Sequence, residues 1–269
     1  MKFAYRIAML ISDVQYYVSF RDRKAVRDNL KVVLRENECV DHLVRDVFRN
    51  FGKYLVDFFR MSKDVNLDYI RRNIRISNLE TLKEIKAGGK GGIILTAHIG
   101  NWELGGVVLS HLGYSSLAIA LPHKERPVNN LFDQQRQLHG INVVPMQLAI
   151  RKCLEAINNN QFVAVLADRN FTTSGEIFDF FGKKTLFPKG AAIFSLKTGA
   201  PIIPIFLIRE NTSKFKLIVE KPIYPPAIMD KEIDQNTLLS LMRQYINVIE
   251  EKIRQHPTQW LMFRRFWIH

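Results

Sequence analysis

Six short apolar segments constrain the fold of this chain more than any other feature. Each has the length of a single strand, and most are separated by helix-length segments such as residues 147–160 and 189–199. The apolar segments occupy residues 92–97, 116–121, 142–146, 162–167, 202–208 and 215–220. Strands that alternate with helices form a sheet with much parallel character and helices on its faces. The sequence therefore predicts an α/β fold with a mixed sheet flanked by helices.

The part of the chain before these segments has a helical pattern. In "RKAVRDNLKVVLREN" and "VRDVFRNFGKYLVDFFRMSK", apolar residues recur at three- and four-residue intervals with basic residues between them. Residues 234–256 have the same character and predict a closing helix. We expect an N-terminal helical segment, 1–88, and an α/β core, 89–269, in one compact unit.

The composition points to an anionic partner and to reduced cysteines. Lys and Arg number 39 against 26 Asp and Glu, a net charge of +13, which favours nucleic acid, phosphorylated molecules or a membrane surface. Cys39 and Cys153 are too few for a disulfide framework and lack the spacing of a zinc or redox site. Because the chain has neither a run of ~20 apolar residues nor a signal-peptide pattern, we expect it on the cytoplasmic side of the cell.

The first helix has an apolar stripe that allows two interpretations. Its members recur at helical spacing and are Phe3, Ile7, Leu10, Ile11, Val14 and Val18. Such a stripe is typical of a helix that lies in a membrane interface. It is equally typical of a helix that packs on the protein's own core.

The segment "ILTAHIGNWELGG" predicts a strand, a tight turn and the start of a helix, with Asn101 as the N-cap and Glu103 in the first turn. On one continuous helix, His98 and Glu103 would point roughly 140° apart, but they can meet if His98 lies in the turn. A carboxylate on one imidazole nitrogen makes the other nitrogen a better base. Alternatively, backbone groups satisfy His98, and Glu103 only complements the helix dipole.

The order of several motifs adds a resemblance. His98-x4-Glu103 resembles the His-x4-Asp/Glu motif of the glycerolipid and glycolipid acyltransferase superfamily, and "HIGNWELGG" is similar to its bacterial lipid A biosynthesis branch. Three further segments are similar to that branch: "FRNFGKYLVDFFR", residues 166–206 and "HPTQWLMFRRFW". The resemblance implies a glycerolipid-acyltransferase-like fold, with 1–88 as a membrane-associating segment and 89–269 as the catalytic core.

The resemblance also implies a reaction. His98 would be the general base and Glu103 its orienting partner, so that an acceptor hydroxyl attacks an acyl thioester without a covalent enzyme intermediate, a metal or a cofactor. The donor would be acyl-ACP (acyl carrier protein) or acyl-CoA (coenzyme A), and the acceptor a glycolipid such as a lipid A precursor.

Further substrate-binding residues are expected around this pair. Residues 121–140 occupy the place of the family's second block, where Arg136 is the better match and Arg126 the second, since arginine holds phosphate or sugar oxygens bidentately. Alternatively, both are solvated charges on a helix face. We also place Asn101 among the substrate contacts.

Polar residues end another buried-type strand. Asp168 and Arg169 follow residues 162–167, where ligands bind in α/β sheets, and the resemblance puts this place close to the reaction. A structural pairing of Asp168 with Arg169 is the alternative. The Glu-Gly-Thr-Arg block of glycerolipid members is missing here, which favours a glycolipid acceptor. Pro201 and Pro204 predict that their strand has an edge or entry role.

Other classes of protein fit less well. No Gly-x-Ser-x-Gly elbow of a serine hydrolase occurs, and the histidines lack the grouping of a zinc enzyme. The alternatives that stay open are a lysophospholipid or mannoside-type acyltransferase with the same dyad, and a non-catalytic basic module that binds membranes or nucleic acid. For an acyltransferase we expect a peripheral or interfacial place on the cytoplasmic face of the bacterial inner membrane, an anionic lipid surface as partner, and no nucleic acid.

Overall fold

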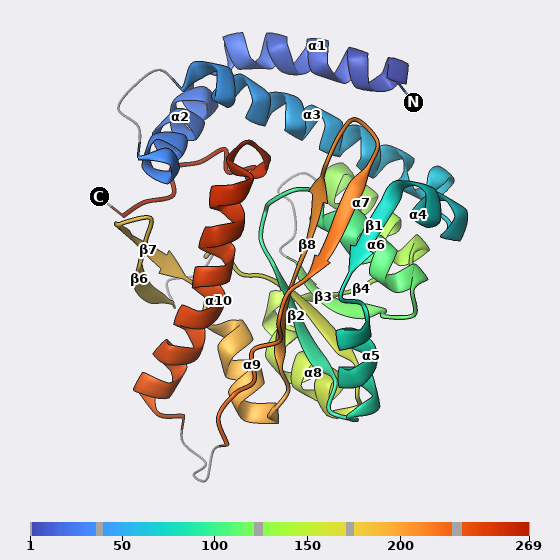
Figure 1. Cartoon of the computed structure of the whole chain (residues 1–269), viewed down its shortest axis with the longest axis vertical. Coiled ribbons are helices and arrows are strands. Elements are labelled where there is room, and N and C mark those ends of the chain that lie inside the picture. The colour runs from blue at the N-terminus through green and yellow to red at the C-terminus, as the bar shows by residue number, and fades with distance from the viewer. Residues whose placement is uncertain (1, 36–39, 121–125, 171–174, 228–232, 269) are drawn as a thin grey trace.

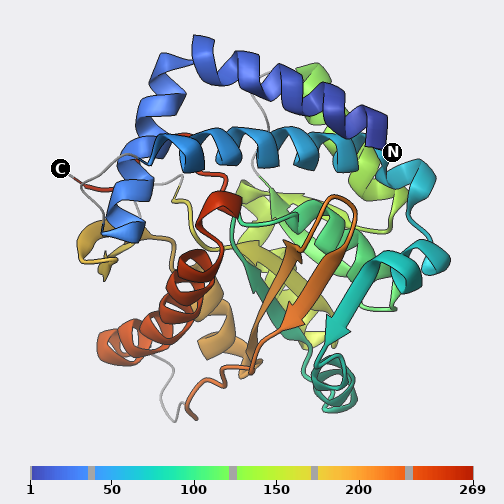
Figure 2. The same ribbon diagram turned by 45° about the horizontal axis from the view of Figure 1, so that its top comes forward.

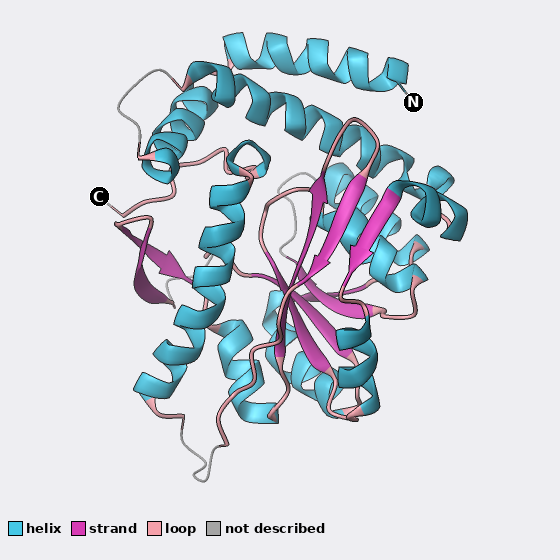
Figure 3. Ribbon diagram, viewed as in Figure 1, coloured by secondary structure: helices cyan, strands magenta, loops and turns pink. Residues whose placement is uncertain are grey.

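A seven-stranded, mostly parallel sheet forms the centre of the protein (Figures 1 and 3). The computed structural model describes residues 2–35, 40–120, 126–170, 175–227 and 233–268. In sheet order the strands are β1 (Ile74–Ser77), β9 (Phe215–Val219), β8 (Ile202–Arg209), β2 (Gly92–Thr96), β5 (Phe162–Leu166), β3 (Ser116–Ala120) and β4 (Asn142–Pro145). Only the β8–β9 pair is antiparallel among the pairs of this sheet in the described residues. The predicted α/β fold is confirmed, and all six apolar segments are strands.

Helices cover both faces of the sheet. The N-terminal helices are α1 (Lys2–Val18), α2 (Phe20–Leu34), α3 (Asp41–Asp64), α4 (Leu67–Asn73) and α5 (Glu80–Ala87). The later ones are α6 (Trp102–His111), α7 (Arg126–Leu138), α8 (Met146–Asn158), α9 (Gly190–Thr198), α10 (Gln235–Gln255) and the short η1 (Pro257–Gln259). Ile93 and Leu95 of β2 pack in a core with α8, α9 and α10, whereas Ile94 packs in a second core with α3, α5 and α6. Strands buried on both faces read as continuous apolar runs, which explains why the sequence reveals them.

Three strands were not predicted. The four-residue β1 lies inside the segment expected to be helical and gains its hydrogen bonds from β9. A separate antiparallel hairpin consists of β6 (Glu176–Phe180) and β7 (Lys183–Phe187). These strands depend on partners that lie elsewhere in the chain or across a turn, so their own residues signal them weakly.

An edge or entry role was expected for the strand with Pro201 and Pro204. The edge role is wrong, whereas Pro201 does lie directly before the first residue of β8. The strand β8 lies inside the sheet, between β9 and β2. Pro204 is paired with Leu95 of β2, and pairing with β9 begins one residue later, at Ile205. The proline therefore lies where β8 changes partner, a position at which its missing N–H costs little.

Helices α1, α2 and α3 form a layer above the carboxyl ends of β2 and its parallel neighbours, and α1 lies along α3 (Figure 2). A Cβ at Gly52 of α3 would lie 2.2 Å from Oγ of Ser12 and 3.0 Å from the carbonyl oxygen of Ala8, so glycine permits this close approach. The opposite side of α1 exposes its apolar stripe: Phe3, Ile7, Leu10, Ile11, Val14, Tyr17 and Val18. Packing of this stripe on the protein's own core, one of the two alternatives above, is therefore wrong. In the described residues, no helix is long and apolar enough to cross a membrane.

Candidate active site

His98 lies in the loop that joins β2 to α6, at the carboxyl end of the sheet. The loop turns at Gly100, whose φ is +65°, and a Cβ there would lie 2.1 Å from the carbonyl oxygen of Leu207. Asn101 then begins α6 as its N-cap, with Oδ1 accepting a hydrogen bond from the backbone N–H of Leu104 at 3.1 Å. The predicted strand, turn and capped helix are confirmed, and glycine is required at the turn because a side chain has no room there.

Asp168, not Glu103, is the carboxylate that contacts His98. It follows β5, the parallel neighbour of β2, and its Oδ1 lies 2.6 Å from Nδ1 of His98. Oδ2 of the same carboxylate accepts hydrogen bonds from the backbone N–H of His98 at 3.0 Å and from Nε1 of Trp260 at 3.1 Å. Asp168 is fully buried, and the His98 side chain is 12% exposed. The pair therefore stands on two adjacent parallel strands, where substrate sites of α/β sheets lie.

Burial and charge set the protonation of this pair. Burial lowers the pKa of His98 below its ordinary value of 6.5, although Asp168 acts in the opposite direction. Burial would raise the pKa of Asp168, but the charge and hydrogen bonds of His98 outweigh it and hold that pKa at about 2. At neutral pH the carboxylate is thus ionised and accepts the Nδ1 proton of a neutral imidazole. Nε2 of His98 then carries the lone pair of a general base.

The structure corrects the role predicted for Glu103. Its carboxylate forms an ion pair with Arg136 of α7, which donates from Nε at 3.0 Å and from a second guanidinium nitrogen. Both side chains are largely buried. A guanidinium offers Glu103 two charge-assisted hydrogen bonds, while Asp168 already occupies Nδ1 of His98. Glu103 and Arg136 therefore join α6 to α7 beside the loop of His98.

The other predicted site residues have different surroundings. Asn101 is buried, and both ends of its amide are used, by Leu104 and by Asp57 of α3. Its predicted substrate contact is therefore not supported. Arg126 is exposed at the start of α7 and makes no hydrogen bond with the described residues. Residues 121–125 of the same predicted block, together with Cys39, lie outside the described residues.

Arg169 lies close to His98. The structural pairing of Asp168 with Arg169, given above as the alternative to a substrate-binding role, is not observed, because no ion pair joins the two described side chains. Its guanidinium donates to the carbonyl oxygen of Leu261 at 2.7 Å, and its buried Nε has no partner among the described residues. The charges of Arg169 and Arg264 both lower the pKa of His98. Arg169 thus keeps a free N–H donor near His98.

The C-terminal segment is a part of the site whose place the sequence did not reveal. Trp260 donates to Asp168, and the backbone N–H of Leu261 donates to the carbonyl oxygen of His98 at 2.8 Å. Ile99 and Trp260 form an isolated antiparallel bridge. The resemblance singled out "HPTQWLMFRRFW", but the residues of that segment alone do not indicate that it forms hydrogen bonds with the His98 loop and with Asp168.

An aromatic surface adjoins the histidine. The ring of Trp102 lies edge-on to the His98 ring, with centroids 4.9 Å apart, and stacks on Tyr54 of α3 at 4.6 Å. Trp102 is partly exposed. Among the described residues, no three His, Cys, Asp or Glu side chains are placed to hold a metal ion. The arrangement offers a base and an apolar surface side by side.

An α/β fold with a carboxylate-oriented neutral histidine at its strand ends is typical of enzymes that activate a hydroxyl or a water molecule. Comparison with known proteins agrees with this class. The chain belongs to the bacterial lipid A biosynthesis acyltransferase family, whose model matches residues 1–269. It is an acyltransferase, so the non-catalytic alternative is set aside.

Several relatives are named acyltransferases. The chain is 25% identical over 262 residues to a phosphatidylinositol mannoside acyltransferase of Mycobacterium tuberculosis, covering 94% of this chain and 80% of the relative. It is 21% identical over 259 residues to a lipid A biosynthesis palmitoleoyltransferase of Escherichia coli, covering 93% and 78%. A lipid A biosynthesis acyltransferase of Haemophilus influenzae is 23% identical over 195 residues, covering 72% and 58%.

Proposed function

We propose that this protein moves a fatty acyl group from an acyl thioester, acyl-ACP or acyl-CoA, to a hydroxyl of a glycolipid at a membrane surface. The observation that carries the proposal is the 2.6 Å contact between Nδ1 of His98 and Asp168, which leaves Nε2 as the base. The family supplies the transferred group, and the names of the relatives supply glycolipids as the class of acceptor.

The reaction needs one proton relay. Nε2 of His98 takes the proton of the acceptor hydroxyl while its oxygen attacks the thioester carbonyl carbon. When the tetrahedral intermediate collapses, the C–S bond breaks, the ester C–O bond remains, and His98 returns the proton to the thiolate. Asp168 keeps the imidazole in the required tautomer and stabilises its charge once protonated. The unpartnered Nε of Arg169 is suited to an oxygen atom of the reacting group.

The remaining side chains of the site have supporting roles in this proposal. Arg136 and Glu103 hold α7 against the start of α6. Trp102, which stacks on the buried Tyr54, offers apolar surface beside His98 for an acyl chain or a sugar ring. The reaction as proposed uses no metal or cofactor.

The exposed stripe of α1 supports a peripheral or interfacial membrane location. Apolar side chains on one face of a helix enter the boundary between headgroups and acyl chains, and basic residues add attraction to anionic lipid. The net charge of +13 fits this surface and an acidic donor such as acyl-ACP. We place the protein on the cytoplasmic face of the bacterial inner membrane, with no nucleic-acid partner.

Two glycolipid acceptors are supported by particular relatives. A lipid A precursor agrees with the family and with the Escherichia coli and Haemophilus influenzae relatives. A mannoside agrees with the Mycobacterium tuberculosis relative. Both acceptors offer a sugar hydroxyl on an anionic lipid, so the same site chemistry serves either of them.

The test supplies the purified protein with acyl-ACP or acyl-CoA and, separately, a lipid A precursor, a phosphatidylinositol mannoside and a lysophospholipid. We expect mass spectrometry to find acyl transfer to a glycolipid, loss of transfer in His98→Ala, and full transfer in the control His42→Ala, which removes an exposed histidine from α3. Transfer to the lysophospholipid alone would refute the glycolipid acceptor. Undiminished transfer in His98→Ala would refute His98 as the base.

A further inference from the structure

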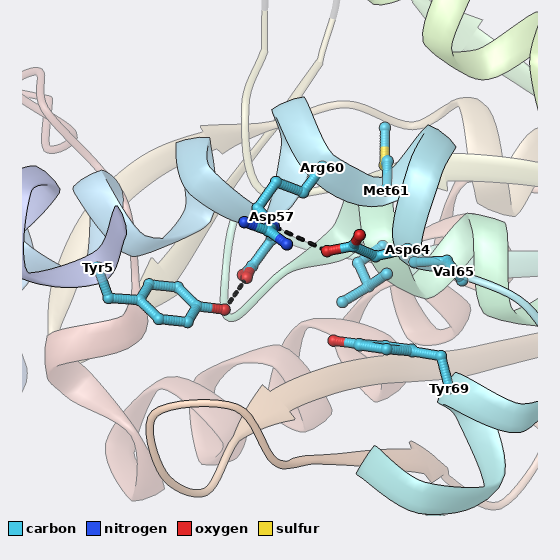
Figure 4. A pocket seen from close by; sticks show the side chains of 8 residues that line it. Tyr5, Asp57, Arg60, Met61, Asp64, Val65 and Tyr69 are labelled. Carbon is cyan, nitrogen blue, oxygen red and sulfur yellow. Dashed lines mark hydrogen bonds and ion pairs between the residues drawn. The ribbon is translucent and has the colours of Figure 1, made fainter. Parts of the chain in front are cut away.

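Tyr5, a buried side chain of the helix that carries the exposed apolar stripe, makes a polar contact with the protein interior. The hydroxyl of Tyr5, on the inner side of α1, donates a hydrogen bond to Oδ1 of Asp57 on α3 (Figure 4). Both residues are buried. A cavity of about 10 Å³, lined also by Met61, Val65 and Tyr69, lies at this joint. A buried polar contact thus joins this end of α1 to α3.

Asp57 also binds two elements of the catalytic core. Its Oδ2 accepts a hydrogen bond from Nδ2 of Asn101 at 2.8 Å and forms an ion pair with Arg209, at the end of β8. The guanidinium of Arg209 lies over the Tyr5 ring, 5.5 Å from its centroid. One carboxylate thereby joins the outer helix, the end of a central strand and the N-cap of α6.

Asn101 gives this contact a direct route to the catalytic histidine. It follows His98 by three residues in the same loop, and its backbone N–H donates to the carbonyl oxygen of Leu207 at 2.9 Å. Its Oδ1 caps α6 while its Nδ2 is held by Asp57. A shift of Asp57 therefore alters the orientation of the Asn101 amide, and with it the loop that presents His98.

We propose that Asp57 is a positioning residue that links the position of α1 on α3 to the conformation of the His98 loop. Binding of α1 to a lipid surface would thereby raise turnover. The proposal rests on the acyltransferase function and the membrane contact proposed above. The outer face of α1 contacts the lipid, and the position of α1 on α3 changes with this contact. The Tyr5–Asp57 hydrogen bond passes the change in position to Asp57, and the Asp57–Asn101 hydrogen bond passes it to the loop of His98.

A second attachment of α1 makes the link testable without losing the helix. Asp13 of α1 forms bidentate ion pairs with Arg45 and Arg49 of α3, at distances of 2.8–2.9 Å. Removing the Tyr5 hydroxyl therefore breaks the link to Asp57 and leaves α1 attached through Asp13. The variant Tyr5→Phe is the appropriate probe, whereas loss of the Asp57 carboxylate would leave Arg209 buried without its charge partner.

The experiment measures turnover of a short-chain, fully dispersed acceptor, with and without added anionic vesicles that contain no acceptor. For the wild type we expect the vesicles to raise kcat several-fold with little change in KM for the acceptor. For Tyr5→Phe we expect equal vesicle binding and no rise in kcat. Tyr224→Phe, which makes the same change at an exposed tyrosine outside α1, should respond like the wild type.

A double-mutant cycle then tests the route through Asn101. Asn101→Ser keeps a capping hydroxyl but cannot reach Asp57 in the same way. The vesicle response of the double variant Tyr5→Phe/Asn101→Ser should equal that of either single variant, because both break one path. A Tyr5 with a purely structural role would lower the melting temperature and leave the ratio of the two rates unchanged.

Two results would overturn the link. One is an equal vesicle response in Tyr5→Phe and the wild type, and the other is additive losses in the cycle. Failure of the link and failure of the function are distinguishable, because an active wild type with an inactive His98→Ala variant upholds the function in either case.

Discussion

Nδ1 of His98 lies 2.6 Å from Oδ1 of Asp168, a residue seventy positions further along the chain. The parallel pairing of β2 with β5 brings the two together, because both residues follow the carboxyl ends of neighbouring strands. Glu103, only five positions from His98, lies in the first turn of α6 and bonds Arg136 instead. The sheet, not the spacing in the motif, therefore determines which carboxylate contacts His98.

Replacement of Trp260 by Phe tests the support of Asp168. The variant keeps an aromatic ring in the core but removes the N–H that donates to Oδ2 of Asp168. Loss of one hydrogen bond to a charged group costs about 1.5–3 kcal/mol, so we expect turnover to fall about tenfold or more. Trp267→Phe is the matched control, because Nε1 of Trp267 is buried without a partner among the described residues. Equal activity of the two variants would remove Trp260 from the account.

Replacement of Gly100 by Ala tests the geometry of the loop that carries His98. The new Cβ would overlap the carbonyl oxygen of Leu207, so the loop must shift, and we expect kcat to fall by at least tenfold. Gly199→Ala is the control: its φ of +72° imposes the same backbone strain, with nothing within 4 Å of the new Cβ. Both variants should lose about 1–2 kcal/mol of stability from the left-handed conformation, measurable by thermal unfolding. Retention of full turnover in Gly100→Ala would contradict the fixed loop.

Much of the fold is predictable from these residues, and the reason is local. Segments such as 92–97 and 162–167 are buried on both faces, so they stand out as apolar runs, and the cap at Asn101 has its own short-range signature. The register of β2 with β5 is not visible in the sequence. His98 and Asp168 were therefore both predicted as site residues, while their pairing was not.

The outward direction of the α1 stripe was also beyond the sequence. An apolar face at helical spacing is the same pattern whether it meets a core or a lipid surface. The structure decides the direction through Tyr5 and Ser12, which are buried on the opposite face against α3. The contact of Trp260 with Asp168 was likewise not predictable, because nothing in the C-terminal segment indicates which distant residue the tryptophan contacts.

Polar substitutions on the exposed face of α1 test the membrane contact. Leu10 and Ile11 are 67% and 62% exposed, so Leu10→Gln/Ile11→Gln should leave the fold intact. Burial of an apolar side chain in lipid contributes up to about 1.5–3 kcal/mol, and every 1.4 kcal/mol is a factor of ten. We therefore expect vesicle affinity to fall at least tenfold in a sedimentation assay. Leu138→Gln/Leu148→Gln, at exposed sites on α7 and α8, should bind like the wild type, and equal binding by both double variants would refute the contact.

Replacement of Glu103 by Gln tests its role as the partner of Arg136. The amide keeps one acceptor but loses the charge, which leaves the largely buried guanidinium uncompensated. Removing one member of a buried pair costs up to about 3–5 kcal/mol, so we expect a melting temperature lower by several degrees. A double-mutant cycle with Arg136→Met measures the interaction by thermal unfolding. Additive losses would show that the pair does not act as a unit.

The most direct test of the account is the pH dependence of kcat/KM for the wild type, Asp168→Asn and Glu103→Gln. The wild-type acid limb should lie below pH 6.5, because burial lowers the pKa of His98. Asp168→Asn removes a charge that raises this pKa, so its limb should move to still lower pH while the maximum falls on the order of 10³-fold or more. In Glu103→Gln, the acid limb of the kcat/KM profile should lie at the same pH as in the wild type. A displaced limb in Glu103→Gln, with the limb of Asp168→Asn unmoved, would make Glu103 the partner of the base and contradict the account.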